Sequence, residues 1–548
     1  MRTPFEISDS FTEQWADADP IAATTYGITG RDELSTDYSP DGYARRTDLY
    51  RATRSELAPF LDGPDPRHTF AAKVQVGWLD EQVAKYEAGE WQRDLNHSYS
   101  PLQVMRDVFD VMGRGTPGDW EVITARLEGL PGMLEGYRQS LQVGLSADRT
   151  VARRQVESTA EQAQAAASPE SRFLAFPRAA ADVGGDAQPV ADVVESVRAA
   201  YADFAAWLQD SYLPQARAED AVGRDDYERG VDEHLGMTLD LEATYEWAWG
   251  EVHRIREEME ATSSEIEPDS STLEVIDLLE TDPSRAAATR EDFVDFVSAI
   301  QEQAISQLAG KHFDVPDELK VVTVNIAPPG GALGAWYVGP SEDFSRPGSI
   351  WYAPGERKAL PYWQEVSTAY HEGFPGHHLQ VATAVINRDE LPRFHRMAIW
   401  YSGAGEGWAL YAERLMDELG FFEKPEYRFG LLASQLMRAT RVIVDIGCQL
   451  SLTIPDHAPL HGGEPWTYEH AVDYMHQIAF QAPDVAESEV KRYLGWVAQA
   501  ISYKVGEREI LAMRERARAE PGFDVKDFHR RMLEAGAIRL DQLWEHMA

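Results

Sequence analysis

The sequence predicts a mainly α-helical protein with one small β-sheet near residues 319–353. Long stretches carry apolar residues at helical spacing, and one short segment alternates as a strand does. Hydrophobic residues make up 43% of the 548 residues, which is enough for a large packed core. We expect a single helical domain over 1–548, with a helical N-terminal part over 1–318 and a part over 319–548 that holds the candidate metal site.

Most of the chain has the pattern of long amphipathic helices. The clearest predicted helices cover 71–86, 190–209, 243–261, 290–309 and 486–505. Many of them follow Ser, Thr, Asp or Pro, which are the residues that begin helices. Residues 168–188 are rich in Ala, Pro and Gly and predict a loop. Residues 269–271 and 282–284 predict helix breaks.

The exception to the helical pattern is the segment 319–353. LKVVTVNI at 319–326 alternates and is rich in Val, which predicts a strand. PPGGALG at 328–334 predicts a turn or an irregular loop. Two short aromatic runs follow, AWYV and SIWYA, separated by GPSEDFSRPG. We expect these two runs to pair as strands of the small sheet.

The chain is strongly acidic, with a formal net charge of -41 from 51 Lys and Arg and 92 Asp and Glu. This charge excludes binding to nucleic acid or to anionic membrane surfaces, because both require clustered Lys and Arg. The acids are spread along the chain. We therefore favour adaptation to a salt-rich cytoplasm, where salt screens the self-repulsion, over an acidic surface for a cationic partner.

The single cysteine, Cys448, cannot form an intramolecular disulfide, and its apolar surroundings predict a buried, unreactive thiol. The N-terminal residues include acids where a secretory signal has an apolar run. No window approaches the length of a membrane span. We expect a cytoplasmic protein; the sequence does not indicate its oligomeric state.

The segment YHEGFPGHHLQ at 370–380 carries the candidate metal ligands. In an ordinary H-E-x-x-H helix two histidines one turn apart share a zinc ion and the Glu acts as general base, but Pro375 stands where the second His would be. On an unbroken helix His377 lies ~9 Å and His378 ~10.5 Å along the axis from His371, so neither shares a metal with it. The helix must therefore be interrupted at Pro375-Gly376. A bulge of two residues selects His377 as the second ligand, and a bulge of three selects His378.

The next segment, GAGEGWALYAE at 403–413, supplies a candidate third ligand. It is predicted to open a helix, and Glu406 and Glu413 lie on one face of it. Glu406 follows two glycines that permit a close helix approach, which favours it as the ligand. Glu413 is either a group that orients a ligand histidine or an ordinary surface acid.

Further residues downstream are candidates for substrate binding. Arg438, Arg441 and Asp445 fall on one side of a predicted helix, where the arginines either bind a peptide carboxylate or form a buried ion pair between helices. Tyr503 either stabilises the oxyanion of a tetrahedral intermediate or packs in the core.

Several segments of the sequence resemble blocks of a known family. HEGFPGHHLQ, EGWALYAE, RATRVIVDIG and RYLGWVAQAISYKVG are similar to blocks of the bacterial and archaeal family called domain of unknown function 885, which is grouped with zincin metallopeptidases. ADPIAATTYGI, RLEGLPGMLEGYRQSLQVG and SRPGSIWYAPGE also resemble family blocks, so the similarity spans the chain.

The resemblance implies a large helical zincin-like body with a deep cleft, similar to the carboxypeptidase Taq and oligopeptidase folds. It implies zinc bound by His371, His377 and Glu406, with Glu372 as general base. EGWA also resembles the third-ligand segment N-E-G-F-A of aminopeptidase N relatives. Family members often carry His where this chain has Gln449, which puts any role of that position in doubt.

These observations together predict a zinc-dependent peptidase that cleaves short peptides, with a zinc-activated water and Glu372 as the base. Two other functions stay open. A di-metal carboxylate oxidase needs two Glu-x-x-His units, and Asp473 and His476 provide only one near match. A non-catalytic helical binding protein with a retained metal is the other, although structural zinc sites usually contain several cysteines.

Overall fold

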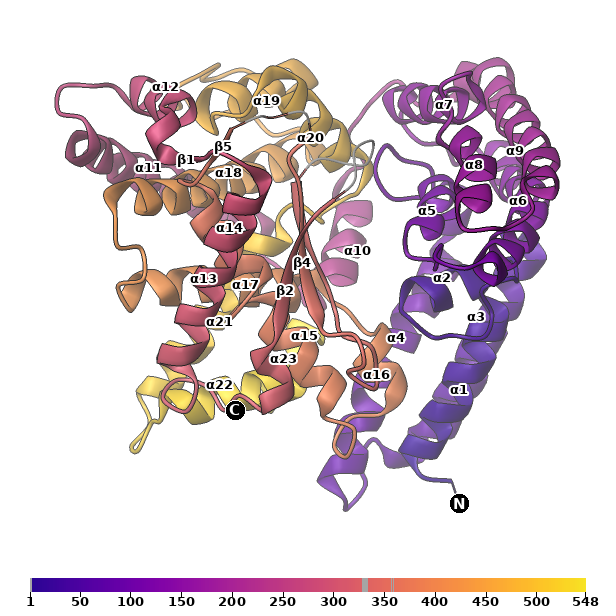
Figure 1. Ribbon diagram of the computed structural model, residues 1–548, viewed down its shortest axis with the longest axis horizontal. Helices are drawn as coiled ribbons and strands as arrows, with labels where there is room; N and C mark the ends of the chain where they lie inside the picture. The colour runs from indigo at the N-terminus through magenta and orange to yellow at the C-terminus, as the bar shows by residue number, and fades with distance from the viewer. Residues whose placement is uncertain (1, 328–333, 356, 358) are drawn as a thin grey trace. The chain divides into compact units, whose positions relative to one another are not determined.

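The computed structural model describes residues 2–327, 334–355, 357 and 359–548 (Figure 1). The chain is mainly helical with a small sheet, which confirms the predicted fold class at that level. It divides into two compact units. The first comprises Met1–Val222, Leu391–Ala398 and Lys491–Trp496, and the second comprises Gly223–Glu390, Ile399–Val490 and Val497–Ala548.

In the described residues of the first unit, the regular structure is entirely helical. Its helices are α1 (Pro4–Ala18), α2 (Pro20–Thr25), α3 (Pro40–Leu57), α4 (Pro66–Ala88), α5 (Pro101–Asp107), α6 (Pro117–Ser146), α7 (Arg153–Ala167), α8 (Phe176–Asp182), α9 (Ala187–Trp207) and α16 (Arg393–Ala398). Predicted helices 71–86 and 190–209 correspond to α4 and α9.

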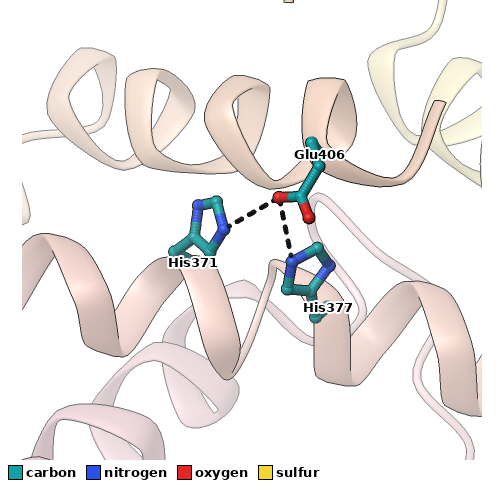
Figure 2. A group of neighbouring side chains, drawn as sticks. All are labelled: His371, His377 and Glu406. Carbon is teal, nitrogen blue, oxygen red and sulfur yellow. Dashed lines mark ion pairs between the residues drawn. The ribbon is translucent and has the colours of Figure 1, made fainter. Parts of the chain in front are cut away.

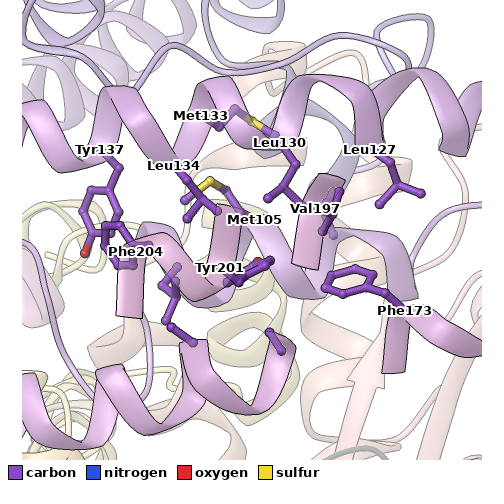
Figure 3. Packing of buried hydrophobic residues seen from close by; sticks show 14 of the residues in the cluster. Met105, Leu127, Leu130, Met133, Leu134, Tyr137, Phe173, Val197, Tyr201 and Phe204 are labelled. Atoms are coloured by element: carbon purple, nitrogen blue, oxygen red, sulfur yellow. The ribbon is translucent and has the colours of Figure 1, made fainter. Parts of the chain in front are cut away.

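The core of the first unit lies between α5, α6 and α9 (Figure 3). Leu130 and Leu134 of α6 face Tyr201 of α9, all at most 2% exposed. The prediction of a loop over 168–188 is wrong, because that segment contains α8 and a short 3-10 turn. Phe173 and Phe176 bury their rings in the core, and this burial favours a helix that the local composition does not.

The second unit holds all the candidate site residues. Its helices are α10 (Arg224–Leu235), α11 (Leu241–Ile266), α12 (Thr272–Thr281), α13 (Arg290–Leu308), α14 (Glu365–Glu372), α15 (His377–Ile386), α17 (Ser402–Glu418), α18 (Pro425–Gln449), α19 (Tyr468–Asp473), α21 (Ser502–Arg518), α22 (Val525–Ala535) and α23 (Leu540–His546). Helix α20 (Pro483–Gly495) has residues in both units. The helix predicted over 290–309 is α13, the one over 243–261 lies within α11, and both predicted breaks flank α12.

The predicted helix 486–505 is wrong as a single element. Helix α20 ends at Gly495 and α21 begins at Ser502, and Ala498 between them has a φ of 63°. The carbonyl of Val497 lies only 2.7 Å from where a Cβ on Gly230 would stand, so the segment approaches α10 closely. This tertiary contact replaces the helical path that the apolar spacing predicts.

The small sheet lies where the sequence predicts it. Strand β4 (Gly348–Ala353) is central, with β2 (Val322–Ile326) parallel to it and β3 (Gly334–Val338) antiparallel. The two aromatic runs therefore pair, with Trp336 opposite Trp351. The predicted loop 328–334 lies outside the described residues except for Gly334. A two-residue pair, β1 (Ala286–Ala287) with β5 (Leu360–Pro361), forms a second sheet.

Helix α17 packs along α21 at a point where glycines replace side chains. A Cβ on Gly407 would lie 2.5 Å from the carbonyl carbon of Gly506, and a Cβ on Gly506 would lie 2.0 Å from the oxygen of Gly403. Only glycine permits this approach of the two backbones. The contact fixes α17, which carries Glu406.

Among the described helices, none combines the length and the apolar composition that a bilayer span requires.

Candidate metal centre

The helix that carries His371 ends one residue later, and a new helix begins at His377. The interruption predicted at Pro375-Gly376 is therefore present, as a complete break between α14 and α15. Gly376 makes the turn possible, since a Cβ there would lie 2.0 Å from the carbonyl oxygen of His371 and 2.4 Å from that of Tyr370. The break brings His377 beside His371, with ring centroids 4.7 Å apart.

Two side chains from other helices bind the polar backbone groups of this turn. Gln301 of α13 accepts a hydrogen bond from the Phe374 N–H at 2.6 Å and donates one to the Ala369 carbonyl at 2.7 Å. The indole N–H of Trp408 in α17 donates to the Pro375 carbonyl at 2.9 Å. These bonds hold the turn against α13 and α17, because buried backbone groups are costly to leave unpaired.

His371, His377 and Glu406 converge from α14, α15 and α17 (Figure 2). The Nε2 atoms of His371 and His377 lie 3.3 and 3.4 Å from the same oxygen, Oε2 of Glu406. Within the described part of the chain that oxygen is buried and has no hydrogen-bond partner, and the same is true of Nδ1 of His377. One unpaired carboxylate oxygen thus faces two imidazole nitrogens.

The hydrogen bonds of His371 determine which of its nitrogens has the free lone pair. Nδ1 lies 2.7 Å from Oε1 of Glu413. An ionised carboxylate only accepts, so Nδ1 carries a hydrogen, and in the neutral ring Nε2 directs its lone pair at Glu406. Two lone pairs 3.3 Å apart repel each other unless a proton or a metal cation lies between them. The three side chains therefore fit a metal ion of the kind that imidazole and carboxylate bind.

Glu413 is fully buried and paired on both oxygens. Ser367 donates to Oε2 at 2.5 Å, and Arg438 donates to Oε1 and Oε2 at 2.9 and 3.1 Å. Burial raises the pKa of Glu413, but the Arg438 guanidinium and the His371 ring outweigh it and keep that pKa below its ordinary value. Of the two interpretations of Glu413, the geometry matches the group that orients a ligand histidine.

The electrostatics of the triad favour opposite charges in close contact. Burial and Arg438 both lower the pKa of His371, yet its contacts with Glu406 and Glu413 raise it to about 9. Burial raises the pKa of Glu406, but the two histidines bring it well below its usual value. Without a metal the site thus holds a proton in the position that a cation would occupy.

His378 lies outside the triad, so the break selects His377. Its Nε2 donates to the Leu319 carbonyl at 2.9 Å, and its Nδ1 lies 3.0 Å from the hydroxyl of Tyr337 on β3. Both nitrogens are occupied by the sheet region. Burial lowers the pKa of His378 to about 4, which keeps the ring neutral.

Glu372 follows His371 directly and is 8% exposed. The charge of Glu372 acts on Tyr352 of the central strand β4. The pKa of Tyr352 is raised mainly by burial, and further by the charges of Glu365 and Glu372. The candidate base therefore follows a triad residue in the sequence and lies near the sheet.

The arginines predicted to bind substrate have protein partners. Arg438 contacts Glu413 as described, and its Nη2 lies 3.3 Å from Nδ1 of His371. Arg441 pairs with Glu489 at 2.7 Å and lies over the ring of Tyr503 at 5.0 Å. Asp445 accepts a hydrogen bond from the hydroxyl of Tyr227 at 3.1 Å. The contacts of the two arginines match the alternative of ion pairs between helices. The proposed substrate-binding roles of Arg438 and Arg441 and the proposed role of Tyr503 stay predictions.

Three residues that support the site are not indicated by the sequence: Gln301, Ser367 and Trp408. Gln301 is 73 positions from its partner Phe374, so no local pattern indicates the contact. Ser367 stands four residues before His371, one helical turn away, and this spacing is the only available signal.

Cys448 is buried at 7% exposure, as predicted.

Solved structures share this fold. A crystal structure described as that of a "putative lipoprotein" from Colwellia psychrerythraea aligns with a TM-score of 0.84 at 22% identity, over 99% of this chain and 98% of that one. A "putative lipoprotein of unknown function" from Shewanella oneidensis aligns with a TM-score of 0.74 at 19% identity, over 100% and 99% of the two chains. No curated protein matches the sequence. Residues 20–547 match the family model described as "Bacterial protein of unknown function (DUF885)", and the chain belongs to this family.

Proposed function

We propose that this protein is a zinc-dependent peptidase that acts on short peptides. The observation that carries the proposal is the approach of two imidazole nitrogens to one buried oxygen of Glu406 that has no hydrogen-bond partner among the described residues, at 3.3 and 3.4 Å. Three protein ligands of this type, next to a further carboxylate, are the composition of a hydrolytic zinc site.

The donor set favours zinc among the common ions. Imidazole suits first-row transition metals and disfavours Mg²⁺ and Ca²⁺, which prefer oxygen ligands. When bound, zinc polarises a carbonyl and lowers the pKa of a coordinated water to about 7. Glu413 and Arg438 fix the ring of His371 through Nδ1, so that Nε2 is directed at the ion.

Glu372 is the proposed general base. Its carboxylate takes the proton of the attacking water and then delivers it to the leaving amine, and a positioned base of this kind contributes roughly 10²–10⁴-fold to a rate. The proposal rests on its position directly after His371 at the end of α14 and on its burial.

The sheet next to the site offers a surface for an extended substrate. Strand β3 is at one end of the three-strand order, and it packs against α14, which carries His371 and Glu372. A peptide that adds to this strand gains main-chain hydrogen bonds. Trp336 of β3, 39% exposed and stacked 6.5 Å from Trp351, is available for its side chains.

The test compares Glu372→Gln with the wild-type protein on a mixed peptide library in high salt, with products mapped by mass spectrometry. We expect the variant to lose at least about 100-fold in hydrolysis while its zinc content equals that of the wild type. Glu423→Gln is the matched control: Glu423 is exposed and accepts a hydrogen bond from Gln303, and we expect this variant to keep full activity.

Two results contradict the proposal. Full activity in Glu372→Gln removes the base assignment, and a zinc-loaded wild type that cleaves no peptide removes the peptidase itself. Iron with oxygen consumption in place of zinc indicates the di-metal oxidase instead. A chelator that abolishes cleavage, with recovery on adding zinc, separates the enzyme from a binding protein with a retained metal.

A further inference from the structure

A second group of potential metal ligands lies far along the sequence from the triad. His461, Glu464 and His470 each offer one ligand atom, and these atoms all lie within 4.8 Å of one another. We call this group the loop cluster. We propose that it binds a divalent first-row transition metal, such as Zn²⁺, that ties the segment 450–467 to helix α19.

The backbone around the loop cluster is held in place by its own hydrogen bonds. The segment between α18 and α19 folds back on itself, with the Ile454 N–H donating to the Glu464 carbonyl at 2.8 Å and the Trp466 N–H donating to the Leu452 carbonyl at 3.0 Å. The indole of Trp466 is buried and donates to the hydroxyl of Tyr245 in α11 at 2.8 Å. The segment thus presents Glu464 from a defined position.

His470 is oriented as metal-binding histidines are. Its Nδ1 lies 3.0 Å from the Pro465 carbonyl, which only accepts, so Nδ1 carries the hydrogen. Its Nε2 then directs a lone pair at Oε2 of Glu464, 3.3 Å away. As in the triad, two lone pairs face each other at a distance that a cation between them would relieve.

His461 completes the loop cluster from the segment side. Its ring stacks on that of His470 with centroids 4.0 Å apart and planes 19° apart. Its Nε2 lies 2.8 Å from Oδ2 of Asp473, the last residue of α19, which fixes the ring. His461 adopts a φ of 53°, an unusual value for a residue other than glycine, and this conformation brings its ring over α19.

The chemistry of the donors selects the class of ion. Two imidazoles and a carboxylate favour Zn²⁺, Ni²⁺ or Cu²⁺ over Mg²⁺ or Ca²⁺. The loop cluster is more exposed than the triad, with 58% of the Glu464 side chain accessible against 15% for Glu406. We therefore expect weaker binding, and a structural role, since one ion joins two ligands of the segment to one of α19.

The test is a Zn²⁺ titration of chelator-treated full-length protein by calorimetry. We expect two classes of site in the wild type. His470→Ala or Glu464→Gln removes the weaker class, and the double variant His371→Ala/His377→Ala removes the tighter class. His476→Ala is the control, because His476 is an exposed histidine whose Nδ1 binds the Gln481 carbonyl, and it keeps both classes.

A second measurement tests the structural role. Limited proteolysis of His371→Ala/His377→Ala, which keeps only the loop cluster, should slow at least tenfold within 450–467 when Zn²⁺ is added, and Glu464→Gln in that background should abolish the protection. A single class of site that Glu464→Gln leaves unchanged, or a weaker class that persists in Glu464→Gln, overturns the proposal. Glu464 is on the surface, so its substitution leaves the fold intact and the outcome is decisive.

Discussion

The triad and the loop cluster contain the same side chains, two histidines and a glutamate, in different surroundings. In both, a histidine donates from Nδ1 to an oxygen and directs Nε2 at a carboxylate 3.3 Å away. The triad lies on three helices, and its carboxylate is 15% exposed; the loop cluster has a carboxylate that is 58% exposed. Orientation of the ligands is therefore common to both, and burial and support distinguish them.

The support of the triad begins with the turn between α14 and α15, and Gly376→Ala is expected to have the largest effect. The new Cβ would overlap the carbonyl oxygens of His371 and Tyr370, at 2.0 and 2.4 Å. We expect a loss of roughly 3 kcal/mol in unfolding free energy and loss of the triad's zinc, since His377 must move. Thermal unfolding and metal analysis measure both.

Gly250→Ala is the matched control for that substitution. Gly250 lies inside α11, where an added Cβ meets nothing within 4 Å, so we expect a gain of about 0.5–1 kcal/mol and normal zinc binding. Retention of the triad's zinc by Gly376→Ala would mean that the turn tolerates a side chain and that the break does not determine the ligand.

Acid should weaken the helices that support the triad. His529 of α22 lies with Nε2 2.7 Å from the hydroxyl of Tyr411 on α17 and Nδ1 2.9 Å from the His312 carbonyl. Burial lowers its pKa to about 4 from an ordinary 6.5. Its neutral form stabilises the fold fully above pH 6.5, and about 3 kcal/mol is lost as the pH falls from about 6.5 to 4, because the unfolded chain takes up the proton first.

The measurement is denaturant unfolding at several pH values for the wild type and His529→Gln. The variant is expected to be less stable at pH 7 but to lose less stability between pH 6.5 and 4. His476→Gln, which alters an exposed histidine, should follow the wild type. Equal pH slopes in His529→Gln and the wild type would exclude this residue as the acid-sensitive group.

The sequence predicts the triad better than it predicts what supports the triad. Pro375 breaks the helix because it lacks an N–H. The second ligand must lie close to His371 in the sequence, so only His377 and His378 are candidates. Local chemistry therefore comes close to determining the ligand set. The contact between Arg438 and Glu413 joins two helices, and no periodicity indicates it. The prediction of one continuous helix over 486–505 is wrong for the same reason. The break after α20 comes with the close approach of Val497 to Gly230, which is a tertiary contact.

Glu413→Gln tests whether support distinguishes the triad from the loop cluster. The amide keeps the size of the side chain but removes the charge that pairs with Arg438 and accepts from His371. We expect zinc affinity at the triad to fall about 10–100-fold, the range typical of groups that orient a ligand. Competition with a chromophoric chelator measures it, with Glu423→Gln as control. Unchanged affinity would show that His371 needs no orientation.

Asp473→Asn makes the corresponding change at the loop cluster and should have the smallest effect. Asp473 binds Nε2 of His461 at 2.8 Å, as Glu413 binds Nδ1 of His371, but its side chain is 40% exposed and that of Glu413 is fully buried. Water can replace an exposed partner, so we expect zinc affinity at the loop cluster to fall by only about 3-fold. The measurement is a Zn²⁺ titration in the His371→Ala/His377→Ala background, with Asp484→Asn as an exposed control in α20. If Asp473→Asn costs as much as Glu413→Gln, then burial does not set the strength of these supporting contacts, and the contrast between the two clusters lies in the ligands alone.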